Sequence, residues 1–251
     1  MSMRSNHSRG LLAALLTGVL VAAPAFAEPD RYGIEREATI EDYEKESGLT
    51  RDEIVRHFTL LLNRSKTVLR DNHFLGVKTW QNPFDVWITQ EIIYETRPEV
   101  IVEAGTHRGG SALLWAMLLE QVEPEGRVIT IDIDDKRTEE AKGHRLAGKV
   151  DFLEGSSTDP AIVAEVRRRV AGKRALVILD SLHTREHVAA ELAAYSPIVP
   201  VGGYLIVQDT PVGGIYAIHD FVKSTDAWQI DKSKERLLYT VNLDGFLKRV
   251  K

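Results

Sequence analysis

The stretch that decides the fold runs from Val100 to Trp115 and consists of VIVEAGTHRGGSALLW. It begins with a continuous β-branched run, Val100–Val102, which is typical of a strand buried on both faces of a parallel sheet. Gly105 and the pair Gly109–Gly110 then let the backbone turn tightly and approach a ligand without intervening Cβ atoms. A helix-forming segment follows from Ser111, and the N–H groups at its start can face a ligand. The stretch predicts a strand, a ligand-binding loop and a helix.

The glycine spacing indicates the class of ligand. Dinucleotide-binding loops carry G-x-G-x-x-G, whereas here an acid, Glu103, lies two residues before Gly105 and the next glycine, Gly109, lies four residues after it. This order resembles motif I of the S-adenosylmethionine-dependent methyltransferases, E/D-x-G-x-x-x-G. The resemblance implies that Glu103, Gly105, Thr106, Gly109 and Ser111 surround a positively charged cofactor. The alternative is an ordinary strand-to-helix turn of an unrelated α/β protein.

Composition limits the function classes. With 251 residues, of which 43% are hydrophobic, the chain can bury a sizeable core, and we expect one domain with N-terminal additions. The net charge of −5 and the lack of a long basic run argue against a nucleic-acid partner. The chain contains no cysteine, which is compatible with export without disulfides.

Residues 1–27 have the pattern of a secretory signal peptide. Arg4 and Arg9 form the positive start, an apolar run extends from Leu11 to Ala23, and Ala25–Ala27 has the A-x-A form of a cleavage site. The run is shorter than the ~20 residues of a membrane-spanning helix, so stable membrane insertion is not expected after cleavage. We therefore predict an exported protein of net charge −7, or a cytoplasmic one if the N-terminus does not act as a signal.

Residues 28–75 are predicted to form an N-terminal arm and a helix that precede the main domain at 76–251. Thr50 is a candidate N-cap with Glu53 three residues later, and the helix should extend to about Arg70. Apolar residues recur along it at helical spacing and predict a face packed on the main domain: Ile54, Val55, Phe58, Leu61, Leu62 and Leu69. The glycine- and proline-containing segment 76–83 is expected to be a connector that could help close an active site.

Strands alternate with helices through the rest of the chain. The expected strands after the first are Arg127–Asp132, Val150–Leu153, Ala175–Asp180 and Gly203–Asp209. This alternation predicts a Rossmann-like α/β domain with a mostly parallel, doubly wound sheet. Three further segments, Trp228–Asp231, Leu237–Val241 and Phe246–Arg249, are expected to complete the sheet, the last two as a C-terminal hairpin about Asn242–Gly245.

Acids stand at the ends of the predicted strands, which meet at one edge of a parallel sheet. Asp132 is placed to bind ribose hydroxyls, and Ser156, by position alone, to line an adenine pocket. Asp180 and Asp209 are hard oxygen ligands suited to Mg²⁺, and a bound metal would lower the pKa of an acceptor hydroxyl. His183 could accept its proton. The alternatives are two helix-capping aspartates and a turn histidine with one hydrogen bond.

Several segments together resemble the cephalosporin hydroxylase family. They are Pro83–Asp85, Glu103–Ser111, Val128–Asp134, Leu179–Thr184, Gly202–Thr210 and Gly245–Arg249. The family is similar to rhamnosyl and macrolide-sugar O-methyltransferases, and the resemblance implies a Rossmann methyltransferase fold, S-adenosylmethionine and Mg²⁺. It also implies cofactor contacts at Glu103, Gly105 and Asp132, and metal at Asp180 and Asp209. Where family members commonly have two adjacent acids, this chain has Gln208-Asp209; the Gln208 amide can give one oxygen to a metal but removes a charge.

The sequence thus predicts a methyl transfer from S-adenosylmethionine to a hydroxyl of a sugar or small natural product, assisted by Mg²⁺, with Asp180 and His183 as catalytic residues. The alternative is an exported, non-catalytic domain that uses the same cleft to bind a small ligand or partner. A nicotinamide oxidoreductase is opposed by the glycine spacing. An iron oxygenase is opposed because a facial site needs two histidines and a carboxylate, and this edge supplies His183 with only His107 as a weak second. The pattern leaves a homo-oligomer open.

Overall fold

The computed structural model describes residues 39–65 and 71–251, so the predicted signal peptide lies outside the described residues. The chain divides into two compact units, residues 1–51 and 52–251. In the first, helix α1 (Ile40–Ser47) begins with a capping box formed by Thr39 and Asp42 and ends at Gly48 in the left-handed conformation. None of the helices in the described ranges combines the length and apolar composition that crossing a membrane requires.

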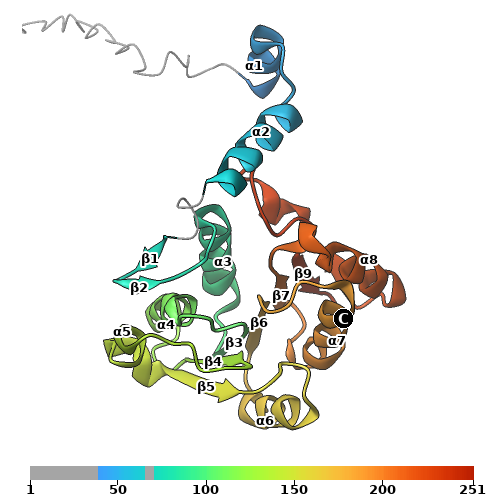
Figure 1. Ribbon diagram of the computed structural model, residues 1–251. Coiled ribbons are helices and arrows are strands. Elements are labelled where there is room, and N and C mark those ends of the chain that lie inside the picture. The colour runs from blue at the N-terminus through green and yellow to red at the C-terminus, as the bar shows by residue number, and fades with distance from the viewer. Residues whose placement is uncertain (1–38, 66–70) are drawn as a thin grey trace, which may run out of the picture. The chain divides into compact units, whose positions relative to one another are not determined.

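The second unit is an α/β domain built on a seven-stranded sheet of order β5-β4-β3-β6-β7-β9-β8, of which the strands from β5 to β9 are labelled in Figure 1. Its strands are β3 (Val100–Ala104), β4 (Arg127–Asp132), β5 (Val150–Glu154), β6 (Ala175–Leu179), β7 (Tyr204–Val207), β8 (Trp228–Ile230) and β9 (Phe246–Arg249). The pairs among β3 to β7 are parallel, and β9 runs antiparallel to both β7 and β8. The predicted mostly parallel, doubly wound sheet is confirmed.

Helices cover both faces of this sheet. The helices described from residue 51 onward are α2 (Arg51–Arg64), α3 (Pro83–Thr96), α4 (Gly110–Val122), α5 (Glu139–Lys142), α6 (Pro160–Val170), α7 (Arg185–Tyr195) and α8 (Gly214–Ser224), with 3-10 turns at Arg145–Lys149, Ser196–Ile198, Thr210–Val212 and Lys232–Glu235. One buried apolar cluster joins α3 and α4 to one face, and a second joins α6, α7 and α8 to the other. A separate hairpin of β1 (His73–Phe74) and β2 (Val77–Lys78) precedes α3.

The apolar face predicted for the first helix of this unit is only partly buried. Phe58 of α2 meets the rings of Tyr239 and Phe84 edge to face, at 5.1 and 6.5 Å between centroids. Leu61, one turn further on, is 71% exposed and packs poorly on the domain. Leu69 lies outside the described residues. The helix is therefore anchored by an aromatic contact rather than by the whole stripe that the spacing predicted.

The antiparallel pair expected at the C-terminal end of the sheet is formed by β8 and β9, whereas the strand predicted at residues 237–241 is wrong, because these residues form no strand. Leu238 has φ +66°, a left-handed conformation that a strand does not accommodate. The buried carboxylate of Asp85, on α3, accepts hydrogen bonds from the Thr240 hydroxyl and from the Val241 N–H. The Val241 N–H thus bonds to a side chain and not to a neighbouring strand. Burial raises the pKa of Asp85 to about 6.

Gly105 directly follows β3 and lies against the backbone of Asp180, which directly follows β6. The β3–β6 ladder ends with the Asp180 N–H donating to the Ala104 carbonyl at 2.8 Å. Gly105 follows with φ +101°, and a Cβ atom there would lie 1.9 Å from the carbonyl oxygen of Asp180. Both the conformation and the space therefore require glycine.

We expect Gly105→Ala to lower the free energy of unfolding by about 3 kcal/mol or more, because the new methyl group overlaps backbone that cannot move without breaking the ladder. Urea unfolding followed by circular dichroism measures the change. Gly148→Ala is the matched control, since nothing lies within 4 Å of the added Cβ. Equal stability of the two variants would show that this close approach does not constrain the fold.

Glu103 ties β3 to its neighbours from beneath the sheet edge. Its fully buried carboxylate accepts hydrogen bonds from Trp115 Nε1 on α4 at 2.8 Å and from the Thr130 hydroxyl on β4 at 2.6 Å. Burial raises the pKa of Glu103 to about 7 in spite of these bonds. The folded protein therefore binds a proton here more tightly than the unfolded chain does.

This difference predicts a pH-dependent stability. A raised folded-state pKa stabilises the fold below the ordinary carboxyl range, and that stabilisation is lost as the pH rises through about 7. Glu103→Gln should remove up to about 3 kcal/mol of the decline in unfolding free energy between pH 5 and pH 8. Urea titrations at both pH values measure it, with the 89% exposed Glu139 changed to Gln as the control. An unchanged decline in the Glu103 variant would contradict the assignment.

Candidate active site

A cleft of about 570 Å³ opens at the carboxyl ends of the parallel strands. From β3 the chain proceeds outward to β4 and β5, and it then returns to the other side of β3 as β6. Ligands of open α/β sheets bind at such a switch point. The cleft is bordered by the segments that follow β3, β4, β5 and β6, by residues 78–81 and by Asp209.

Most of the predicted site residues border this cleft. They are Gly105, Thr106, Ser111, Asp132, Ser156, Asp180, His183 and Asp209. Ser156, at the end of β5, pairs with the Thr158 hydroxyl at 3.0 Å. The remaining three predictions, for Glu103, Gly109 and Gln208, need correction, because none of these residues borders the cleft.

The glycine loop forms the floor of the cleft. Gly110, at the start of α4, borders it, and a Cβ there would lie 2.3 Å from the Lys78 carbonyl oxygen. Gly109 has a structural role instead: it caps α4 with φ +89°, and a Cβ there would meet that of Ala141 at 3.0 Å. The predicted cofactor contact of Gly109 is therefore replaced by tight packing against α5.

Asp132, at the tip of β4, holds the loop and faces the cleft. Its Oδ2 accepts the backbone N–H of Thr106 at 3.1 Å and that of His107 at 2.8 Å. Its Oδ1 has one long contact, 3.5 Å, with the Asp134 N–H. One oxygen thus orders the glycine loop while the other can accept hydrogen bonds from a ligand hydroxyl.

The direct cofactor contact predicted for Glu103 is not available in this structure. Successive strand residues point to opposite faces, so the Glu103 side chain lies on the α4 side of the sheet and not at its edge. Its carboxylate is fully buried and bonded to Trp115 and Thr130. Glu103 acts on the cleft indirectly, by fixing α4 against β3 and β4.

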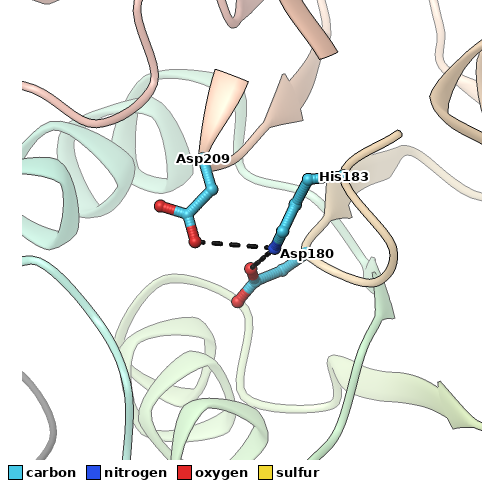
Figure 2. A group of neighbouring side chains, drawn as sticks. All are labelled: Asp180, His183 and Asp209. Atoms are coloured by element: carbon cyan, nitrogen blue, oxygen red, sulfur yellow. Dashed lines mark ion pairs between the residues drawn. The ribbon is translucent and has the colours of Figure 1, made fainter. Parts of the chain in front are cut away.

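Three side chains from the ends of β6 and β7 converge, as Figure 2 shows. His183 Nε2 lies 3.5 Å from Asp209 Oδ2 and 4.0 Å from Asp180 Oδ1, and all three ligand atoms fall within 4.8 Å of one another. Burial raises the pKa of Asp180 well above its ordinary value, with a further contribution from the Asp209 charge. Burial also raises the pKa of Asp209. A cation would relieve this concentration of negative charge.

Gln208 does not join this group. Its side chain is 5% exposed and turns behind Asp180, where its amide pairs with the amide of Gln81 at 3.0 Å. Gln81 also donates to Asp180 Oδ2 at 2.9 Å, and a rotated Gln208 amide would donate to the same oxygen at 2.8 Å. The residue expected as a metal ligand therefore supports Asp180 through uncharged amides.

The sequence pattern does not identify residues 78–81 as site residues, although it predicts that segment 76–83 could help close an active site. Trp80 lies against the ring of His107, with centroids 4.4 Å apart, and both border the cleft. His187 and Glu191 were also missed; their i, i+4 spacing on a helix was the available signal. Nothing in the sequence pattern placed Gln81 beside Asp180, because 99 residues separate them.

Comparison with known proteins gives consistent relatives. The matching part is 36% identical over 144 residues to the rhamnosyl O-methyltransferase of Mycobacterium tuberculosis (strain ATCC 25618 / H37Rv), covering 56% of this chain and 58% of that protein. The Mycobacterium leprae (strain TN) rhamnosyl O-methyltransferase is 33% identical, with 56% and 61% covered. The chain thus matches a little over half the length of these relatives.

Solved structures share the fold. An apo structure of CmcI aligns with a TM-score of 0.60 and 19% identity, over 72% of this chain and 77% of that one. A second CmcI structure aligns equally well over 75% and 83%. The rhamnosyl O-methyltransferase/CmcI family model matches residues 66–250, which include every strand of the main sheet and all of the cleft. The resemblance noted in the sequence is confirmed: this chain belongs to the rhamnosyl O-methyltransferase/CmcI family.

Proposed function

We propose that this protein is an S-adenosylmethionine-dependent O-methyltransferase that acts with Mg²⁺ on a hydroxyl of a sugar or small natural product. The observation that carries the proposal is that one cleft unites the glycine loop, the ribose-type acid Asp132 and the convergent Asp180, His183 and Asp209. The names of the relatives support the same chemistry, since they are rhamnosyl O-methyltransferases. The alternative of a non-catalytic domain is not favoured, because the chemical groups of the cleft are assembled.

The residues of the cleft fit the cofactor. A volume of about 570 Å³ lies within the range of small-molecule sites. Gly105 and Gly110 border the cleft, and a side chain at either position would collide with a backbone oxygen of the neighbouring segment. Asp132 Oδ1 can accept hydrogen bonds from ribose hydroxyls. One of the CmcI structures is described as an Mg–SAM complex, which supports this assignment for the family fold.

The acidic residues fit a divalent cation. Asp180 and Asp209 would hold Mg²⁺ through carboxylate oxygens, and His183 Nε2, 3.5 Å from Asp209 Oδ2, lies beside them as a base outside the set of metal ligands. When bound, the ion would act as a Lewis acid that makes an acceptor hydroxyl more acidic and orients it. Gln81 and Gln208 would keep Asp180 in place without adding charge.

The chain's own residues complete the transfer. Bound S-adenosylmethionine would supply the methyl group to the acceptor oxygen, with a methyl ether and S-adenosylhomocysteine as the products. His183 Nε2 takes the hydroxyl proton, and the neighbouring carboxylates of Asp209 and Asp180 stabilise the resulting imidazolium. Export by the N-terminal segment remains a prediction, as does the identity of the acceptor.

Cofactor binding is tested with Asp132→Asn. The amide oxygen can still accept the loop N–H groups, but the charge and one acceptor site for the ribose are lost. We expect micromolar binding of S-adenosylmethionine to the full-length protein and about 10-fold weaker binding to the variant, measured by calorimetry. Asp151→Asn, at the opposite end of the sheet, is the control. Absence of binding to the unaltered, folded protein would refute the proposed function.

Metal dependence is tested with Asp209→Asn. Loss of one carboxylate from the Asp180–His183–Asp209 group should weaken Mn²⁺ binding about 10-fold or more while S-adenosylmethionine affinity stays within about 3-fold. Calorimetric titrations with each ligand measure this separation, and S-adenosylhomocysteine formation with a panel of rhamnosides reports activity. The exposed Asp226→Asn is the control. If Mn²⁺ bound both proteins equally, the metal assignment would be wrong.

A further inference from the structure

A buried polar cluster borders the cleft where the segments after β5 and β6 meet α7. It consists of Ser157 after β5, Ser181 after β6, and His187 and Glu191 on α7. Glu191 is 1% exposed, and its Oε1 accepts the hydroxyls of Ser157 at 2.5 Å and Ser181 at 2.6 Å. Nothing in the transfer described above uses this cluster.

The charge of Glu191 is balanced by His187. His187 Nε2 lies 3.3 Å from Glu191 Oε1 and 3.2 Å from the Ser157 hydroxyl. A carboxylate this deeply buried needs a partner that carries or donates a proton. The hydrogen bond to Glu191 accordingly raises the pKa of His187 above its ordinary value. The contact with Glu191 thus favours the protonated form of His187.

The orientation of the ring leaves one donor for a ligand. Nε2 points inward to Glu191 and Ser157, whereas Nδ1 has no hydrogen bond to any residue of the described part of the chain. His187 itself borders the cleft. Since both ring nitrogens of an imidazolium carry a proton, Nδ1 is available as a donor to a molecule in the cleft.

The cleft that His187 borders also has apolar side chains that suit a planar base. Ile133 after β4 and Leu182 after β6 are exposed apolar side chains, 64% and 57% accessible, and both border the cleft. Ile133 directly follows Asp132, and Leu182 lies two residues after Asp180, so a base attached to a ribose at Asp132 would have apolar side chains within the same cleft. Ring nitrogens of adenine are acceptors without protons and match a donor such as Nδ1.

We propose that His187 recognises the nucleobase of the cofactor, by donating a hydrogen bond from Nδ1 to a ring nitrogen of adenine, and that Glu191 is the positioning residue that turns and charges the imidazole. This inference rests on the proposed function, because it takes an adenine nucleoside as the ligand. It adds the residues that distinguish adenine from a base with a donor at the same edge.

The test uses S-adenosylhomocysteine and its 1-deaza, 3-deaza and 7-deaza analogues, each of which replaces one ring nitrogen by C–H. In calorimetric titrations of the full-length protein, we expect one analogue to bind about 10- to 100-fold more weakly than S-adenosylhomocysteine, as for a lost hydrogen bond to a charged donor. Equal affinity of all three analogues and the parent would overturn the proposal without any variant being needed.

Variants then assign the effect to His187. His187→Phe should bind S-adenosylhomocysteine about 10- to 100-fold more weakly and no longer distinguish the sensitive analogue from the parent. Glu191→Gln, which keeps the shape and removes the charge, should reduce the same discrimination. His219→Phe is the matched control. His219 lies on α8, does not border the cleft and forms a similar pair with Asp244, so this variant should leave the affinities unchanged. Full discrimination retained in both His187 and Glu191 variants would overturn the assignment.

The two levels of the proposal fail differently. If the unaltered protein binds S-adenosylhomocysteine but the analogue and variant effects simply add, the role of His187 is wrong and the proposed function stands. If the unaltered protein binds none of the four compounds, both are wrong. Circular dichroism and thermal unfolding of each variant establish that it is folded before it is titrated.

Discussion

The backbone contact between Gly105 and Asp180 is the constraint on which the site depends. Two parallel strands end side by side there, and the carbonyl of Asp180 occupies the space that any other residue at position 105 would fill. The glycine loop after β3 and the segment after β6 therefore begin side by side, at the carboxyl ends of two paired strands. This arrangement brings the carboxylates of Asp132 and Asp180 to a single cleft.

The acids of the main domain divide into two kinds with different physical roles. Glu103 and Asp85 are buried away from the cleft, accept several hydrogen bonds each and have raised pKa values because of burial. Their hydrogen bonds stabilise the fold: Glu103 links β3 to β4 and α4, and Asp85 holds the segment before β9. Asp132 and Asp209 border the cleft, where a carboxylate can meet a ligand. Acids of the same domain thus have different roles, which depend on whether the carboxylate is buried or borders the cleft.

Strand positions and eight of the residues that border the cleft were predictable because they depend on local signals: continuous apolar runs, a glycine loop and acids at strand ends. The errors concern contacts between distant segments. Residues 237–241 have an apolar pattern but are held by Asp85, which no periodicity reveals. Gln208 stands at a ligand position yet meets Gln81, 127 residues away, and a strand residue such as Glu103 could face either the edge or the helix above it. Side-chain direction at the end of a strand requires the packed neighbours.

The position of β9 also bears on how the domain folds. This strand lies between β7 and β8, so β8 has no other partner in the sheet and remains unpaired until β9 has been inserted. Its other pairing joins Phe246 to Ile206 across 40 residues of chain. Contacts of such separation form slowly because a long loop must close first. The parallel half of the sheet can therefore assemble early, whereas the edge beyond β7 is completed last.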